Sequence, residues 1–158
     1  MFAFVVLSTG LFSSERGKEA VYAGLAKTRS SMTLSSGMVA TSAGLTQIDT
    51  VEFDMTLAAS AGEANLDPNA TSNSTIITYI DDSLVVPDVV YTVTPLIGDA
   101  DTLLEPGELI RVSVDLAAAG AAVQPNESFT LEIKPPTGSF LVLQRTAPPA
   151  LEAVMTLN

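Results

Sequence analysis

The sequence contains no cysteine, no histidine and no tryptophan among its 158 residues. Without cysteine the chain forms no disulfide and offers no thiol nucleophile. Without histidine it has no Ser-His-Asp triad and none of the imidazole ligands typical of zinc and haem sites. Aromatic residues make up only 6% of the chain, which argues against a carbohydrate-binding module that stacks sugars on aromatic rings. These absences leave oxygen-ligated cations as the main class of metal site open to this protein.

Positive charge is scarce after the first thirty residues. The net charge is −11 at pH 7. Residues 1–30 carry four basic and two acidic side chains, whereas residues 31–158 carry three basic side chains, Arg111, Lys134 and Arg145, against sixteen acidic ones. A segment with this excess of negative charge repels the phosphate backbone of nucleic acids. We therefore expect no nucleic-acid partner.

The chain begins with a short apolar run, MFAFVVLSTGLF. From Phe2 to Phe12 it is shorter than the roughly 20 residues that cross a bilayer. It also lacks the basic flank and the small-residue cleavage site of a secretion signal. We therefore predict neither a signal peptide nor a membrane span in this sequence.

Residues 2–36 have the spacing of a long α-helix. Apolar residues recur at intervals of three, four and seven, no proline interrupts them, and Gly37 is placed to cap the end. Three glycines recur every seven residues, and glycine inside a helix costs roughly 1 kcal/mol relative to alanine. Close approach of another helix compensates for such a cost, although the same stripe could pack on the protein's own β-domain. The predicted packing residues are Phe4, Leu7, Gly10, Leu11, Gly17, Val21, Gly24 and Leu25.

After about residue 45 the hydrophobic period changes from helical spacing to two, which predicts β-strands. The fold class is therefore mainly β, with a long N-terminal α-helix (residues 1–40) followed by an antiparallel, immunoglobulin-like β-sandwich (residues 41–158). Pro87 and Pro95 should mark strand ends or edge strands. Residues 59–74 and 98–108 are predicted loops. The predicted strands are 51–57, 75–80, 84–93, 110–116, 129–134, 139–145 and 151–157.

The loop at 98–108, GDADTLLEPGE, gathers four carboxylates: Asp99, Asp101, Glu105 and Glu108. Alternating aspartates in a glycine-containing loop resemble the start of an EF-hand loop, and Ca²⁺ takes six to eight oxygen ligands. No third aspartate stands at the expected position, so a solvated acidic turn is the competing interpretation. The pattern makes structural Ca²⁺ the candidate cofactor.

Three N-x-S/T sequons mark candidate glycosylation sites at Asn69, Asn73 and Asn126. The first two lie in the predicted loop at 59–74, and the third follows Pro125 at a predicted turn. Glycosylation at such sites implies an exposed position in a secreted protein.

Three stretches together resemble the archaellins, the archaeal flagellins that build the archaellum filament: VVLSTGLFSSERGKEAVYAGL, SSGMVATSAG and DADTLLEPGELIRVSVDL. The resemblance extends over nearly the whole chain. It implies a non-enzymatic, extracellular subunit that associates with copies of itself and with other archaellins. It further implies that the N-terminal helices pack in the filament core, and that the outer sandwich is often N-glycosylated and in some members binds a metal ion.

Compared with the family pattern, the leader peptide, its cleavage site and the first apolar turns of the helix are absent, so we expect an N-terminally truncated archaellin. Such a chain should be monomeric or weakly associated in solution. Two alternatives share parts of this plan: an adhesive archaeal type IV pilin and, with less support, a surface carbohydrate-binding module.

Overall fold

The structure is a computed structural model, and it describes residue 18 and residues 32–58 and 62–157. The predicted packing residues of the N-terminal helix lie outside these ranges. Within them, no helix has the length and apolarity needed to span a membrane.

A six-stranded antiparallel sheet forms one layer, with strand order β12-β2-β3-β9-β7 and with β1 added against β3. Its strands are β1 (Met32–Leu34), β2 (Met38–Thr41), β3 (Thr50–Leu57), β7 (Tyr91–Ile97), β9 (Leu109–Asp115) and β12 (Val154–Leu157). Strand β9 alternates between buried and half-exposed residues, and β3 does so except at the buried Asp54, as expected for strands with one face on a core.

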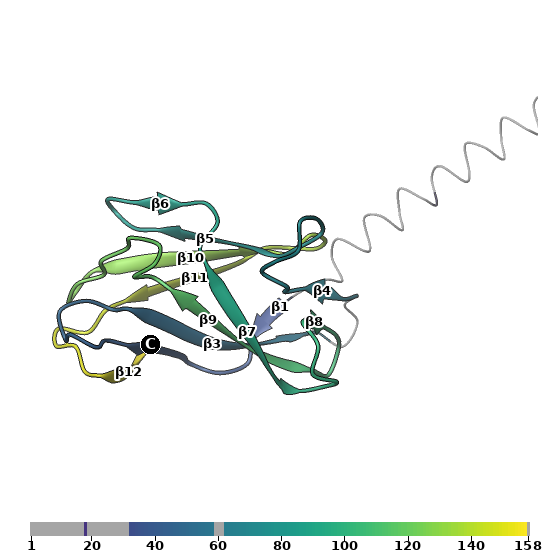
Figure 1. The fold of residues 1–158 in the computed structure, drawn as a ribbon, viewed down its shortest axis with the longest axis horizontal. Coiled ribbons are helices and arrows are strands. Elements are labelled where there is room, and N and C mark those ends of the chain that lie inside the picture. Colours follow the sequence, from purple (N-terminus) through teal and green to yellow (C-terminus); the bar gives the residue numbers. More distant parts are fainter. Residues whose placement is uncertain (1–17, 19–31, 59–61, 158) are drawn as a thin grey trace, which may run out of the picture.

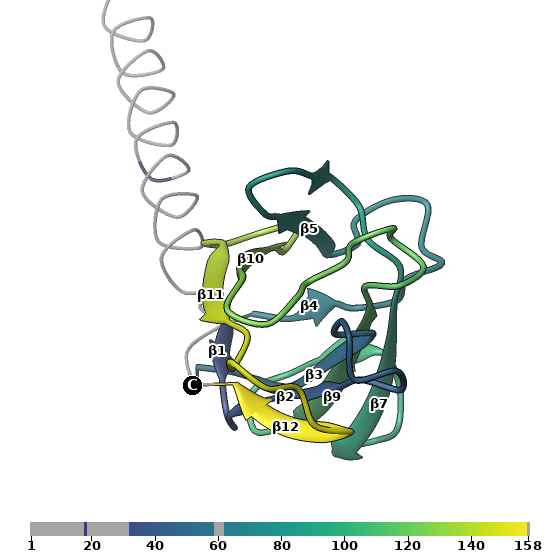
Figure 2. The same ribbon diagram turned by 90° about the vertical axis from the view of Figure 1, so that its left-hand side faces the viewer.

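A four-stranded antiparallel sheet, in the order β11-β10-β5-β6, forms the second layer (Figures 1 and 2). Its strands are β5 (Ile76–Ile80), β6 (Val85–Val86), β10 (Ser128–Lys134) and β11 (Leu141–Thr146). A separate two-stranded ribbon joins β4 (Ala64–Asn65) to β8 (Leu103–Leu104). The mainly β, antiparallel class predicted from the sequence is confirmed.

The inward faces of the two sheets share one hydrophobic cluster. Phe53 of the larger sheet and Phe129 of the smaller one are each about 1% exposed, and Tyr79 stacks on Phe129 with ring centroids 6.1 Å apart. Burying one such side chain contributes roughly 1.5–3 kcal/mol. The Tyr79 hydroxyl, whose pKa is raised by burial and by Asp81, donates to the Asp81 carboxylate at 2.6 Å.

The sheet takes in residues that the sequence assigned to the end of the helix. A helix continuing to Ser36 is wrong, because Met32–Leu34 form β1 and pair with Met55–Leu57 of β3. Met32 follows Leu25 by seven residues, which fits the spacing of a helix. The same residue is buried in the sheet, so strand pairing overrides the local pattern. Residues 32–34 and 38–41 thus belong to the six-stranded sheet.

Most predicted strands are confirmed with small shifts at their ends. The predicted strand at 84–93 is wrong as one element, because it divides into β6 and the start of β7. Pro87 follows β6, and Pro95 lies in the edge strand β7 beside a register shift. The two predicted loops are not wholly irregular, since each contributes one strand of the β4–β8 ribbon.

Strands β1 and β2 lie along the same side of β3 and are separated by a bulge. Between the pairs Leu34↔Met55 and Val39↔Glu52, the outer chain advances five residues and β3 advances three. The two extra residues interrupt the ladder beside Asp54, whose carbonyl accepts the Ser35 N–H at 2.8 Å.

Asp54 is a buried carboxylate on the solvent side of this sheet, at 8% exposure. Arg111 of β9 donates to it through both Nε and Nη2, at 2.7 and 3.1 Å. The pKa of Asp54 is held below its ordinary value by the Arg111 hydrogen bonds, against the opposing effect of burial, and further by Ser36. The charged pair therefore ties β3 to β9 beside the β1–β2 bulge.

Replacing Asp54 with asparagine should lower the free energy of unfolding at pH 7 by about 1.5–3 kcal/mol, the usual worth of hydrogen bonds to a charged group. Because the folded-state pKa lies below the ordinary 3.8, this contribution is complete above that value and is lost as the pH falls through the folded-state pKa. Urea unfolding at pH 7, 5 and 3 should therefore show that the difference in unfolding free energy between the wild type and Asp54→Asn becomes smaller in acid.

Glu152→Gln is the matched control, because Glu152 is an exposed carboxylate with no hydrogen bond or ion pair within the described ranges. It should leave the unfolding free energy nearly unchanged. A deficit for Asp54→Asn that widened in acid would contradict the proposed role of the charged pair.

Candidate functional site

The acidic loop connects β7 to β9 and is held by hydrogen bonds from two other segments of the chain. The Thr56 hydroxyl of β3 donates to the Glu108 carbonyl at 2.8 Å. The Leu66 N–H donates to the Thr102 carbonyl at 2.9 Å, next to the β4–β8 ribbon. Backbone contacts, and not the acidic side chains alone, therefore set the shape of this loop.

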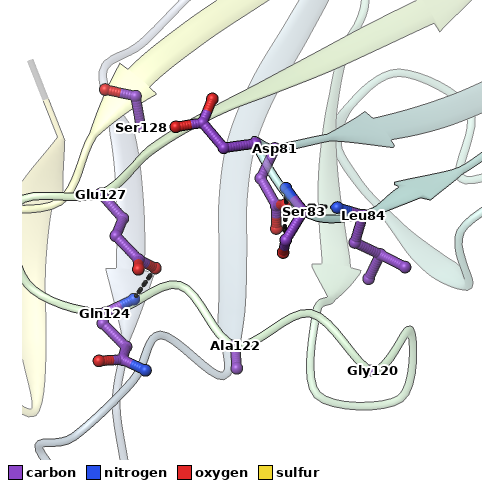
Figure 3. Close-up of a pocket in the computed structure, with 9 residues that line it drawn as sticks. Asp81, Ser83, Leu84, Gly120, Ala122, Gln124, Glu127 and Ser128 are labelled. Carbon is purple, nitrogen blue, oxygen red and sulfur yellow. Dashed lines mark hydrogen bonds between the residues drawn. The ribbon is translucent and has the colours of Figure 1, made fainter.

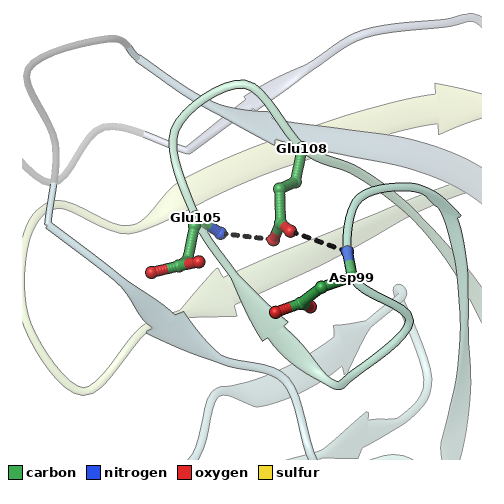
Figure 4. Close-up of side chains that lie close together, drawn as sticks. All are labelled: Asp99, Glu105 and Glu108. Carbon is green, nitrogen blue, oxygen red and sulfur yellow. Dashed lines mark hydrogen bonds between the residues drawn. The ribbon is translucent and has the colours of Figure 1, made fainter.

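Three of the four predicted ligands come together in the loop. Carboxylate oxygens of Asp99, Glu105 and Glu108 lie within 4.8 Å of one another (Figure 4). Asp99 and Glu105 are exposed and Glu108 is half-buried. The spacing suits a single ion, because two oxygens each about 2.4 Å from a bound Ca²⁺ can be at most about 4.8 Å apart.

Glu108 also organises the loop through its carboxylate. Its Oε1 accepts the Asp99 N–H at 3.3 Å and its Oε2 accepts the Glu105 N–H at 3.0 Å. Gly98 makes this approach possible: its φ is +139°, and a Cβ at this position would lie 2.3 Å from Glu108 Oε1. Any larger residue at 98 must displace the Glu108 carboxylate.

Asp101, the fourth predicted ligand, does not belong to this cluster. Its Oδ1 accepts the Leu103 N–H at 2.7 Å, at the start of β8. The preceding residue, Ala100, has a left-handed φ of 68°. The structure thus gives Asp101 a turn-stabilising hydrogen bond and brings the other three carboxylates together.

The residues present fit a hard cation. All three clustered side chains offer oxygen, which Ca²⁺ and Mg²⁺ prefer. No lysine or arginine within the described ranges forms an ion pair with them, since the two ion pairs found there are Arg111–Asp54 and Lys134–Glu132. The exposed acidic triad could therefore bind a metal ion, with main-chain carbonyls and water completing its ligands.

The three sequons differ in the accessibility of their hydroxyl residue. Asn69 and Thr71 are both exposed. Asn73 is exposed, but Thr75 is only 2% exposed, with its N–H bonded to the Asn65 carbonyl and its own carbonyl bonded to the Tyr91 hydroxyl. Burial, together with Asp88 and Asp67, raises the pKa of Tyr91 to about 12, so this hydroxyl remains a donor.

The third sequon lies at the entrance to β10. Asn126 is exposed with a left-handed φ of 64°, and the Ser128 hydroxyl is paired with that of Thr146 at 2.8 Å. The sequence signal located all three asparagines but could not show which hydroxyl residues are covered.

A pocket of about 420 Å³ lies beside this sequon, between the turn at residues 81–84 and the segment 120–128 (Figure 3). Although burial opposes it, hydrogen bonds from Tyr79, Ser83 and Leu84 lower the pKa of Asp81. Glu127 accepts the Gln124 N–H at 2.8 Å. Both carboxylates thus hold turns in place, and the pocket walls show no arrangement for acid–base catalysis.

Comparison with known proteins gives a consistent family. The model for archaeal-type flagellin matches residues 1–145. The chain is 31% identical to probable flagellin 1 of Archaeoglobus fulgidus over 174 residues, covering 99% of this chain and 85% of that protein. It is 26% identical to probable flagellin 2 of the same organism over 170 residues, covering 95% and 81%.

Solved structures agree in fold. The archaeal flagellum of Methanospirillum hungatei strain JF1 matches with a TM-score of 0.77 at 21% identity, covering 99% of this chain and 87% of that one. The crystal structure of flagellin FlaB1 from Methanocaldococcus jannaschii matches with a TM-score of 0.64 at 18% identity, covering 81% and 96%.

Proposed function

The chain belongs to the archaeal-type flagellin family, and from that premise we propose how its parts divide the work of building a filament. An archaeal flagellin is a structural subunit of the archaellum, the extracellular filament of archaeal motility, and it is not an enzyme. This membership decides against the type IV pilin and carbohydrate-binding alternatives.

In this proposal the N-terminal segment is a helix that packs with copies of itself in the filament core. The immunoglobulin-like sandwich then forms the outer surface. Support comes from the family match, which includes the N-terminal segment, and from the spacing of the apolar and glycine residues. The basic residues of that segment also complement the strongly acidic remainder of the chain.

Gly17→Leu should prevent filament formation, because a bulky side chain on the glycine stripe keeps neighbouring helices apart. The matched control is Lys18→Leu at the adjacent exposed position. Both variants would be expressed in an archaeon without its own flagellins, and filaments would be counted by electron microscopy. Equal assembly of the two variants would contradict packing through the stripe. A chain that never forms filaments even when an archaellin leader and the first helical turns of the family are added to it would contradict the function.

For the acidic loop we propose structural Ca²⁺ binding by Asp99, Glu105 and Glu108. The observation that carries this proposal is the approach of the three carboxylates within 4.8 Å. A cation relieves their mutual repulsion, and in doing so it ties the β7 end of the loop to the β9 end. Asp101 then supports the loop through Leu103 and is not itself a ligand.

Ca²⁺ at 100 times its dissociation constant should stabilise the wild-type fold by about 2.7 kcal/mol, and thermal unfolding with and without Ca²⁺ measures this as a higher melting temperature. Asp99→Asn combined with Glu105→Gln should abolish the shift, since both changes remove ligand charge but keep similar shapes. Asp101→Asn is the control and should retain the shift, because the asparagine oxygen can still accept the Leu103 N–H. An Asp101→Asn chain that lost the shift would place Asp101 among the ligands, as the sequence suggested.

We also propose that Asn69, Asn73 and Asn126 are glycan acceptors, with Asn69 modified in the folded chain and Asn73 only before folding. The exposed Asn69–Thr71 sequon remains available after folding. The Asn73 sequon loses its hydroxyl residue to the interior, because Thr75 is buried. Asn126 should be intermediate, since Ser128 is exposed but hydrogen-bonded.

Incubating the folded, unmodified chain with an oligosaccharyltransferase should give glycan at Asn69 and almost none at Asn73. A peptide spanning residues 67–77 should be modified at both, because nothing covers its Thr75. Glycopeptide mass spectrometry measures the fraction of Asn69 and of Asn73 that carries a glycan. Asn69→Gln is the matched control, because it has no acceptor at residue 69. Rapid modification of Asn73 in the folded chain would refute the dependence on folding.

A further inference from the structure

Strand β11 is the terminal strand of the four-stranded sheet, and among the described strands it pairs with β10 alone (Figure 2). Its six residues, LVLQRT, contain no proline, and its register with β10 runs through six pairs without a shift. A regular edge strand presents a row of unpaired backbone N–H and C=O groups to any strand that approaches. This edge is therefore a place where a second copy of the chain could add a strand.

The other terminal strands of the two main sheets have features that β11 lacks. The edge strand β7 contains Pro95, which has no N–H to donate, and its register shifts beside that residue. Strands β12, β1 and β6 have only four, three and two residues. Prolines, bulges and short length all discourage pairing between sheet edges. Strand β11 must therefore be protected in another way, or not at all.

The hydrogen bonds just after β11 show which of its backbone groups point outward. The Ala147 N–H donates to the Glu127 carbonyl at 2.8 Å, and the Ala147 carbonyl accepts the Asn126 N–H at 3.1 Å. Both backbone groups of Ala147 thus face the β10 side, and along an antiparallel strand this direction alternates from one residue to the next. The residues whose N–H and C=O point to the free edge are therefore Val142, Gln144 and Thr146.

Arg145 covers one of these outward-pointing groups. It pairs with the buried Phe129, so its side chain starts on the core side of the sheet. Its Nη1 donates to the Gln144 carbonyl at 2.8 Å. Because that carbonyl points to the free edge, the guanidinium lies at the edge as well. An inward-pointing charge on an edge strand discourages strand addition, since an added strand would take the charge out of water.

No other contact within the described ranges explains this placement of Arg145. It forms no ion pair there, whereas Arg111 and Lys134 each do. Its Nε is buried and has no hydrogen-bond acceptor among the described residues, and a buried donor without an acceptor lowers stability. Covering the edge carbonyl is therefore the role that the contacts of this guanidinium support.

We propose that Arg145 prevents β11 of a second copy from adding antiparallel to this edge. The two strands would be identical, so the outward N–H groups of one copy match the outward carbonyls of the other. The Gln144 carbonyl becomes an acceptor for this pairing only when Arg145 releases it. The released guanidinium would then lie beside a strand that has no carboxylate to pair with it. This role goes beyond the proposed function, because it concerns the unassembled chain.

Arg145→Thr should open this edge, and Lys134→Thr is the matched control, because it removes the same charge from the central strand β10. Sedimentation equilibrium of the full chain should give a dimer dissociation constant at least about tenfold lower for Arg145→Thr than for the wild type, since each copy then offers one more carbonyl to the pairing. As this dimer forms, hydrogen exchange should slow at the N–H groups of Val142, Gln144 and Thr146.

Gln144→Pro tests whether the association uses the β11 edge. The Gln144 N–H points outward, so proline at this position keeps the hydrogen bonds to β10 but offers no donor to a second strand. Arg145→Thr combined with Gln144→Pro should therefore return the dissociation constant to the wild-type value. Association caused by partial unfolding would not be reversed in this way.

An Arg145→Thr chain that associates no more strongly than the wild type overturns the proposal. Equal association of Lys134→Thr also overturns it, because net charge alone would then be the cause. Association that persists with Gln144→Pro, or that leaves exchange at the three N–H groups unchanged, assigns the contact to another surface and likewise overturns it. If Arg145→Thr does not fold, Arg145→Met keeps the apolar stem of the side chain and should give the same results.

Discussion

Strand β3 is the element on which the rest of this structure depends. It pairs with β9 along one side and with both β1 and β2 along the other, and its inward residues Val51, Phe53 and Met55 are almost fully buried. The outward Asp54 adds the pair with Arg111 at the position where the β1–β2 ladder is interrupted. The strand that follows the N-terminal segment is therefore fastened to the centre of the larger sheet, and not to a free edge.

The same strand helps to position the acidic loop. Thr56, at the end of β3, holds the Glu108 carbonyl, and Glu108 in turn gathers the N–H groups of Asp99 and Glu105. The β4–β8 ribbon brings the segment with two sequons beside this loop. The candidate cation site and the segment with the Asn69 and Asn73 sequons are thus connected through the β4–β8 ribbon.

Charge is divided along the chain in a way that suits polymerisation. The first thirty residues are net positive and the sandwich is strongly negative. Within the sandwich, Lys134 and Glu132 form an ion pair on the four-stranded sheet. Repulsion between the acidic sandwiches discourages random association.

The sequence by itself determined the β-class, most strands, the acidic loop and the family resemblance, because period-two alternation and turn residues are local signals. Tertiary structure decided what depends on distant partners. Met32–Leu34 leave the helical pattern because β3 offers them a ladder, and residues 64–65 and 103–104 become strands only by pairing with each other. Asp99, Glu105 and Glu108 converge while Asp101 turns to Leu103, since backbone dihedrals at Gly98 and Ala100 aim the side chains. The sequence gives only the number of residues between two side chains. Whether those side chains form a binding site depends on the directions in which the folded backbone points them.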